Sequence, residues 1–136
     1  MASIGYARVS TARQDETQQV DALKAEGCER VFHERISTTV PSIKREQLQA
    51  CLKSLMPGDE LVVAKLDRLG RTQVEVIVCL NVLQQEGIFV RTLDGLINTK
   101  ALGKMAPLVV GLLTGLAEVE RSLIQERTSE SIAHRK

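Results

Sequence analysis

The chain has 136 residues, a formal net charge of +1, a hydrophobic content of 43% and an aromatic content of 2%. This length fits one domain with a buried core. The charge is unlike that of a dedicated nucleic-acid-binding module, so any DNA affinity is either confined to one face or supplied by another segment. The few aromatic residues disfavour proteins that stack single-stranded bases.

The cysteine and histidine patterns argue against a disulfide framework or a metal centre. The three cysteines form no CxxC pair, and the two histidines stand alone. We therefore expect free thiols in a reducing cytoplasm, with no metal and no cofactor. The most apolar stretch, Met105 to Ala117, is shorter than the roughly 20 residues that span a bilayer, so no membrane association is expected.

Apolar patterns along the chain predict alternating strands and helices. The predicted strands are Ser3–Val9, Arg30–Glu34, Glu60–Ala64 and Ile88–Thr92. The predicted helices are Gln14–Glu26, Arg45–Met56 and a third from its cap Thr72 to about Gln85. Ser37 to Lys44 contains a proline and is expected to be a loop, and Asp94 to Lys104 an irregular or short-strand connection. From about Ala106 a long helix is predicted to run toward the C-terminus.

This alternation predicts an α/β fold with a mainly parallel sheet flanked by helices. We expect residues 1–104 to form the α/β core and residues 105–136 the long helix. Ligands of such sheets bind beyond the carboxyl ends of the strands. The segments that follow the first and third strands should therefore meet at one edge.

Two basic segments fall at that edge, Tyr6 to Thr11 and Leu66 to Arg71. Arginine binds phosphate oxygens through a planar fork of donors. Arg8, Arg68 and Arg71 could together hold a phosphate while the Ser10 hydroxyl attacks it. Asp67 is either an acid or base for this reaction or a partner that orients a neighbouring arginine.

Each of these residues also has a plainer interpretation. Arg68 and Arg71 could be solvated surface charges, Ser10 could cap the first helix, and Gln14 and Gln19 could be exposed polar residues of that helix. No single residue decides between these interpretations. The combination at one sheet edge favours the phosphate site.

The long final helix also has two interpretations. Its apolar positions could only cover the sheet, or they could form the face of a dimer, the commonest oligomer. They are Leu108, Leu112, Leu116, Val119, Leu123 and Ile124. Near the end of the chain, Arg127, Arg135 and Lys136 could contact the DNA backbone.

Taken together, these motifs resemble the catalytic domain of the small serine recombinases, the resolvases and DNA invertases. The resemblance covers nearly the whole chain. Its markers are Tyr6-Ala7-Arg8-Val9-Ser10-Thr11, Gln14, Gln19, Ala22 to Cys28, Gly58 to Val63, Lys65 to Arg71, Ala117 to Arg121 and Glu126-Arg127-Thr128.

The resemblance implies that Ser10 attacks double-stranded DNA, forming a 5′-phosphoserine linkage and releasing a 3′-hydroxyl without metal or small-molecule cofactor. Arg8, Arg68 and Arg71 would carry the phosphate, supported by Asp67, Arg45, Gln14 and Gln19, and Arg127 would contact DNA. The family acts as a homodimer on each site and as a tetramer at synapsis. It usually has Ser-Gly after the second strand, where this chain has Ser37-Thr38 and a longer loop to Arg45.

The family normally continues into a basic linker and a helix-turn-helix domain. This domain is absent from the present chain, which we expect to be a truncated part of a longer protein, with a naturally short protein as the alternative. We therefore interpret the chain as the catalytic domain of a site-specific serine recombinase. The alternatives are a non-catalytic dimeric module that holds DNA and, more weakly, a small-molecule phosphoesterase.

Overall fold

The computed structural model describes residues 2–9, 13–37 and 39–116. Its centre is a four-stranded sheet with the strand order β2-β1-β3-β4. The strands are β1 (Ser3–Val9), β2 (Arg30–Arg35), β3 (Glu60–Val63) and β4 (Phe89–Thr92). All three strand pairs are parallel. The predicted α/β fold is therefore confirmed, and each strand lies within one residue of its predicted bounds.

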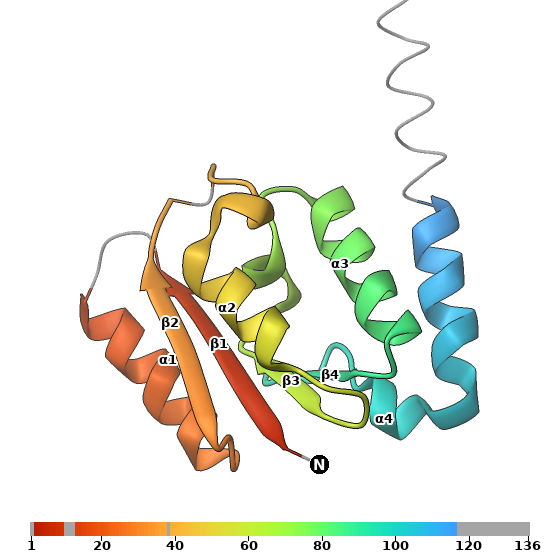
Figure 1. Cartoon of the computed structure of the whole chain (residues 1–136), viewed down its shortest axis with the longest axis horizontal. Coiled ribbons are helices and arrows are strands. Elements are labelled where there is room, and N and C mark those ends of the chain that lie inside the picture. Colours follow the sequence, from red (N-terminus) through yellow and green to blue (C-terminus); the bar gives the residue numbers. More distant parts are fainter. Residues whose placement is uncertain (1, 10–12, 38, 117–136) are drawn as a thin grey trace, which may run out of the picture.

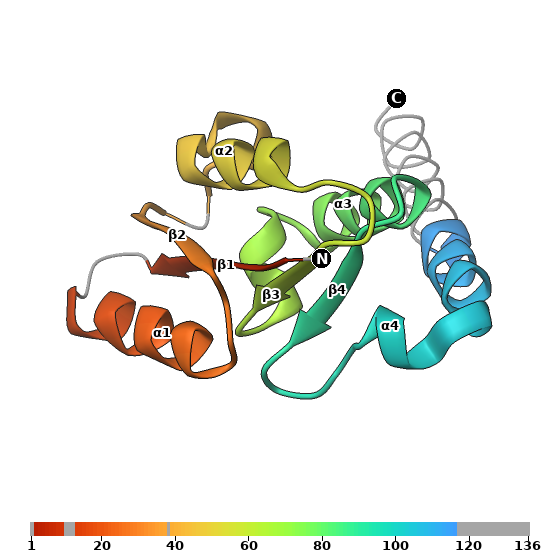
Figure 2. The same ribbon diagram turned by 60° about the horizontal axis from the view of Figure 1, so that its bottom comes forward.

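Helices cover both faces of this sheet (Figures 1 and 2). Helix α1 (Arg13–Ala25) lies on one face, and α2 (Glu46–Ser54) and α3 (Gln73–Gln85) lie on the other. Thr72 caps α3 as predicted, because its side chain accepts a hydrogen bond from the backbone N–H of Glu75. Gly87 follows α3 with a φ of 78°, a backbone conformation that glycine adopts without steric cost.

The core is divided by the sheet into two parts. On the α2 and α3 side, leucines of both helices pack against apolar residues of β1 and β3. On the α1 side, Ala7, Leu23 and Val62 form a smaller cluster. Residues 61–63 of β3 are all buried, so the strand is apolar on both faces, as expected inside a parallel sheet.

Three connections differ from the sequence prediction. The segment from Asp94 to Lys104 contains helix α4 (Thr99–Leu102) followed by a short 3-10 helix, η3 (Gly103–Met105). This segment is attached to the edge of β4, because the Thr99 hydroxyl accepts a hydrogen bond from the Val90 N–H at 2.8 Å. Two further 3-10 helices, η1 (Ser42–Lys44) and η2 (Leu66–Leu69), form within stretches without a helical apolar pattern.

The final described helix spans residues 106–116 beside α3 (Figure 1). It contacts the core through Ala106 and Val110, whereas Leu108, Leu112 and Leu116 are 56%, 62% and 66% exposed. The interpretation that these leucines cover the sheet is therefore wrong within the described residues. The predicted continuation of this helix lies outside them. No described helix is long and apolar enough to cross a membrane.

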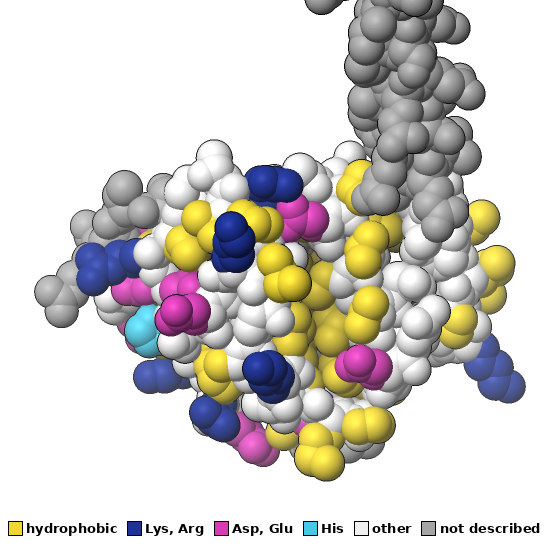
Figure 3. Space-filling view, turned by 45° about the horizontal axis from the view of Figure 1, so that its top comes forward, with side chains coloured by type: hydrophobic (Ala, Val, Ile, Leu, Met, Phe, Trp, Pro, Cys, Tyr) yellow, Lys and Arg dark blue, Asp and Glu magenta, His cyan; other side chains and the backbone are white. Residues whose placement is uncertain are grey.

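An apolar groove runs between α2 and α3 and is visible as a band of hydrophobic side chains in Figure 3. Leu52 and Leu55 line its α2 side, and Val78 and Val82 line its α3 side. Arg71 and Glu75 lie at its polar end. The groove therefore adjoins the segment that the sequence assigned to phosphate binding.

The buried centre of β3 generates the first prediction. Leu61 is fully buried between the sheet and α3, so Leu61→Ala should lower the free energy of unfolding by about 2–5 kcal/mol. Leu96 is 72% exposed, and Leu96→Ala should change stability by less than about 0.5 kcal/mol. Urea unfolding measures both variants, and equal losses would contradict the described core.

Candidate active site

The structure brings the two basic segments together at the carboxyl edge of the sheet. β1 and β3 are parallel neighbours, so the end of β1 that carries Arg8 lies beside η2, which follows β3. The Arg8 side chain is almost fully buried, with a residue exposure of 5%, and its Nη1 donates to the Ile36 carbonyl at 3.0 Å. This juxtaposition is the one that the fold prediction required.

Arg8 lies in an environment that disfavours its own charge. Burial lowers its pKa from the ordinary value, and the positive charges of Arg68 and Arg45 lower it further. Arginine nevertheless stays protonated at neutral pH. Three positive side chains are thus gathered at a poorly solvated site, an arrangement that an anion would stabilise.

A cleft of about 420 Å³ opens beside these arginines, between α1 and the ends of β1 and β3. Arg8, Arg68 and Gln19 line it. In the described part of the chain, the buried side-chain atoms without a hydrogen-bond partner are Arg8 Nε, Arg68 Nε and Gln19 Oε1. Two of these atoms are donors of charged groups, and unsatisfied donors of this kind favour a negatively charged ligand.

Arg45 is fully buried and joins several elements of the site. Its Nε donates to the Val40 carbonyl at 2.9 Å and its Nη1 donates to the Arg68 carbonyl at 2.9 Å. It also lies close enough to Tyr6 to affect the pKa of the phenol. These contacts hold the loop after β2 against η2. The supporting role expected for Arg45 in catalysis stays a prediction.

The sequence interpretation missed Glu34. Its carboxylate accepts a hydrogen bond from the Tyr6 hydroxyl at 2.7 Å and hydrogen bonds from the backbone N–H groups of Gln47 and Leu48. It therefore caps α2 from β2 and fixes the residue that precedes the helix, Arg45. No local motif could reveal this cap, because the helix and its capping carboxylate are joined only by the fold.

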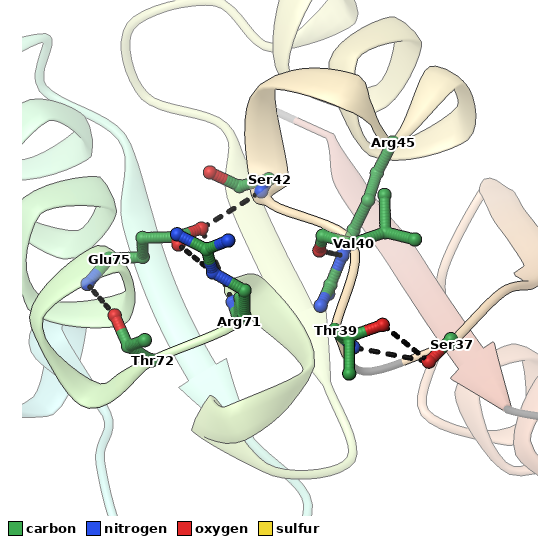
Figure 4. A network of polar contacts seen from close by, with 8 residues as sticks. All are labelled: Ser37, Thr39, Val40, Ser42, Arg45, Arg71, Thr72 and Glu75. Atoms are coloured by element: carbon green, nitrogen blue, oxygen red, sulfur yellow. Dashed lines mark hydrogen bonds and ion pairs between the residues drawn. The ribbon is translucent and has the colours of Figure 1, made fainter.

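Glu75 was also missed, although Thr72 and Glu75 have the spacing of a capping box. Thr72 makes its half of the box, but the Glu75 carboxylate turns instead to the loop and to Arg71 (Figure 4). It accepts hydrogen bonds from the Ser42 N–H at 2.9 Å and from Arg71 Nε at 3.2 Å. Arg71 is therefore held by a carboxylate rather than by the Arg8 and Arg68 cluster.

The remaining predicted residues divide into two groups. Asp67 contacts Arg68 Nη1 at 2.7 Å, which favours its orienting role, and Gln19 Nε2 donates to the Arg8 carbonyl at 3.2 Å. Five predicted site features lie outside the described residues, namely Ser10, the side chain of Gln14, Arg127, Arg135 and Lys136. Their roles stay predictions.

Fold and site together define an α/β domain with a cluster of arginines at the carboxyl ends of two adjacent parallel strands. The family described as "Resolvase, N terminal domain" matches residues 3–136. The chain belongs to this family, as its resemblance to the small serine recombinases led us to expect.

Named relatives agree with this assignment. Serine recombinase gin of Escherichia phage Mu is 43% identical over 131 residues, which cover 96% of this chain and 65% of the relative. DNA-invertase hin of Salmonella typhimurium is 39% identical over 133 residues, which cover 98% of this chain and 68% of the relative. The chain thus spans about two thirds of the length of these relatives.

Solved structures show the same fold. A resolvase family site-specific recombinase from Streptococcus pneumoniae superimposes with a TM-score of 0.67 at 21% sequence identity. The superposition covers 99% of this chain and 98% of that structure. At this identity the likeness bears on the fold alone.

The contact between Tyr6 and Glu34 generates the second prediction. Tyr6 is the chain's one tyrosine, and burial together with the Glu34 carboxylate raises its pKa above the ordinary value. The folded protein should therefore show no tyrosinate absorbance at about pH 10, where unfolded tyrosine titrates. The Tyr6–Glu34 contact contributes fully to the free energy of unfolding below that pH. This contribution is lost as the pH rises above it.

Ultraviolet titration with circular dichroism checks this expectation, and the same titration in urea provides the unfolded control. Tyr6→Phe removes the hydroxyl and keeps the ring, so it should lower stability by about 1–3 kcal/mol. Tyrosinate formation near pH 10 in a folded protein would contradict the buried contact.

Proposed function

We propose that this chain is the catalytic domain of a site-specific serine recombinase that cleaves and rejoins DNA through Ser10. The observation that carries the proposal is that the Nε donors of Arg8 and Arg68, two arginines that line one cleft, are buried and lack hydrogen-bond partners. Ser10 follows β1 directly in the sequence. In the proposed reaction, a backbone phosphate bound in this cleft is the group that Ser10 attacks.

The proposed reaction is a transesterification at phosphorus. The Ser10 oxygen forms a bond to the phosphorus atom, and the bond from phosphorus to the 3′ oxygen of the DNA breaks. The serine loses its proton and the leaving 3′ oxygen gains one, so the DNA ends carry a 5′-phosphoserine and a free 3′-hydroxyl. The reverse attack by a 3′-hydroxyl rejoins the strand without an external energy source.

The arginines would act on the charge of the phosphoryl group during this reaction. Positive groups that are already in place at a poorly solvated site stabilise the transition state without reorganisation. The peptide carbonyl of Arg68 accepts a hydrogen bond from Arg45, and the Arg68 side chain contacts Asp67. This support keeps Arg68 in position before the DNA binds.

The proposal includes an assembly of several copies. The exposed leucines at positions 108, 112 and 116 recur every four residues along the helix at residues 106–116. An exposed apolar stripe of this kind fits burial against a second copy. We propose a homodimer through this helix, with two dimers forming the tetramer that exchanges strands.

Further parts of the proposal concern regions outside the described residues. Arg127, Arg135 and Lys136 would contact the DNA backbone, and the core of residues 1–104 would be followed by the long helix of residues 105–136. A helix-turn-helix domain in the full-length protein would choose the DNA sequence. A DNA substrate also implies that the protein works in the cytoplasm.

A covalent adduct tests the reaction and provides the third prediction. The chain, joined to the C-terminal third of the phage Mu relative, is incubated with the recombination site of that relative. We expect an adduct that survives denaturing electrophoresis and is absent in Ser10→Ala. Arg8→Ala and Arg68→Ala should each reduce its rate by about 10²–10³.

Arg30→Ala is the matched control, because Arg30 begins β2 at the opposite, amino end of the sheet and is exposed. It should leave the rate unchanged. A folded, DNA-binding protein that forms no adduct would contradict the catalytic proposal and favour the alternative of a DNA-holding module.

The exposed stripe generates the fourth prediction. Leu112→Glu places a charge in the proposed dimer face and should convert the dimer to a monomer in analytical ultracentrifugation, because burying an unpaired charge is costly. Met56→Glu is the control, since Met56 is 67% exposed in the connection after α2. Loss of the dimer in both variants, or in neither, would contradict this face.

A further inference from the structure

Glu75 gathers three donors from two separate segments. Its Oε1 accepts hydrogen bonds from the Ser42 N–H at 2.9 Å and the Arg71 N–H at 3.3 Å, and its Oε2 accepts one from Arg71 Nε at 3.2 Å. The carboxylate thus binds Arg71 at its backbone and at its guanidinium. The Arg71 side chain is 51% exposed, and its guanidinium meets Glu75 as an i,i+4 ion pair. The backbone N–H groups of Ser42 and Arg71 hold the carboxylate in place, so this ion pair has a fixed partner.

The contact between the Arg71 guanidinium and Glu75 leaves the two Nη groups available for another ligand. The bond to Glu75 uses Nε, and no described contact engages the two Nη groups. Arg71 also lines a hollow that Arg8, Lys65 and Asp67 share. The Glu75 contact therefore directs Arg71 beside the residues that line this hollow, with the Nη donors that suit a phosphate oxygen still available.

The position of Glu75 is itself fixed by a close approach of the backbone. A Cβ atom added to Gly70 would lie 2.7 Å from the Glu75 Cβ, closer than packed atoms approach. The start of α3 thus packs directly on the end of η2. The Thr72 cap holds the same turn through the Glu75 N–H at 3.2 Å.

Glu75 also binds the loop between β2 and α2, which is longer here than in the family pattern. Ser42 lies in the longer loop between β2 and α2, and its N–H reaches Glu75 (Figure 4). Arg45, at the end of that loop, reaches the Arg68 carbonyl. The loop is therefore tied to the η2–α3 segment at two points, and one of them is the carboxylate that holds Arg71.

The charge state of Glu75 agrees with this role. Burial acts to raise the pKa of its carboxyl, but the hydrogen bonds from Ser42 and Arg71 outweigh burial and lower the pKa below the ordinary value. Glu75 is therefore ionised at neutral pH and binds its donors as an anion.

We infer that Glu75 is a positioning residue for DNA cleavage, which orients Arg71 toward the scissile phosphate and couples it to the loop that carries Ser42. The inference rests on the proposed function. Glu75 touches no reacting atom; it acts through Arg71, so its contribution should vanish when Arg71 is absent.

A double-mutant cycle on the covalent-adduct assay tests this inference and is the fifth prediction. Glu75→Gln removes the charge and keeps the backbone cap, and it should slow adduct formation about tenfold by misdirecting Arg71. In an Arg71→Ala background the same change should alter the rate less than about twofold, because coupled residues are non-additive. Additive losses, or no loss in Glu75→Gln, would overturn the inference.

Two controls separate positioning from folding. Glu86→Gln makes the same chemical change at the other end of α3 and should leave the rate unchanged. Thermal unfolding of each variant reports on the fold. If Glu75→Gln does not fold, Glu75→Asp keeps the charge, shortens the side chain by one methylene and should give the same non-additivity with Arg71→Ala.

A second readout stays informative if the wild type forms no adduct. Nuclear magnetic resonance of the Arg71 Nε–H group is followed while inorganic phosphate is added. We expect a phosphate-dependent shift that requires several-fold more phosphate in Glu75→Gln and is unchanged in Glu86→Gln. If the wild type forms no adduct but shows this pattern, the proposed reaction is rejected while Glu75 still positions Arg71 for phosphate. An equal or absent response in wild type and Glu75→Gln would overturn that positioning.

Discussion

The parallel pairing of β1 with β3 is the constraint on which the rest of the site depends. Because the two strands are neighbours and point the same way, Arg8 and η2 come to one edge of the sheet although they are far apart in the sequence. The gathered arginines repel one another, and burial weakens their solvation. The surrounding contacts exist in large part to hold these charges in place.

Carbonyl and carboxylate oxygens supply that support. Arg8 donates to the Ile36 carbonyl and Arg45 donates to two more carbonyls, so guanidinium groups are fixed without being neutralised. Carboxylates bind the other parts of the site: Asp67 contacts Arg68, Glu34 caps α2, and Glu75 binds the loop and Arg71. The site therefore keeps a net positive character at its centre, which is what a phosphate ligand requires.

Much of the fold could be predicted from local pattern. The strands, the three main helices and the Thr72 cap follow from apolar spacing and capping chemistry, which act over a few residues. The helix at residues 99–102 could not be predicted in this way, because its Thr99 hydroxyl is fixed by the edge of β4. The leucines after position 106 had two interpretations until the fold showed that other residues of that helix face the core.

The sequence by itself determined the residue types of the site, the alternation that makes a parallel sheet and the family to which the chain belongs. These properties depend on short motifs and on the periodicity of apolar residues. Only the tertiary structure decided the distant partners: that Glu34 supports the helix after Arg45, that Arg45 binds the Arg68 carbonyl, and that Glu75 binds the Ser42 N–H. The physical reason is that hydrogen bonds and ion pairs depend on atoms a few ångströms apart, and chain order does not determine which distant residues the fold brings to that distance.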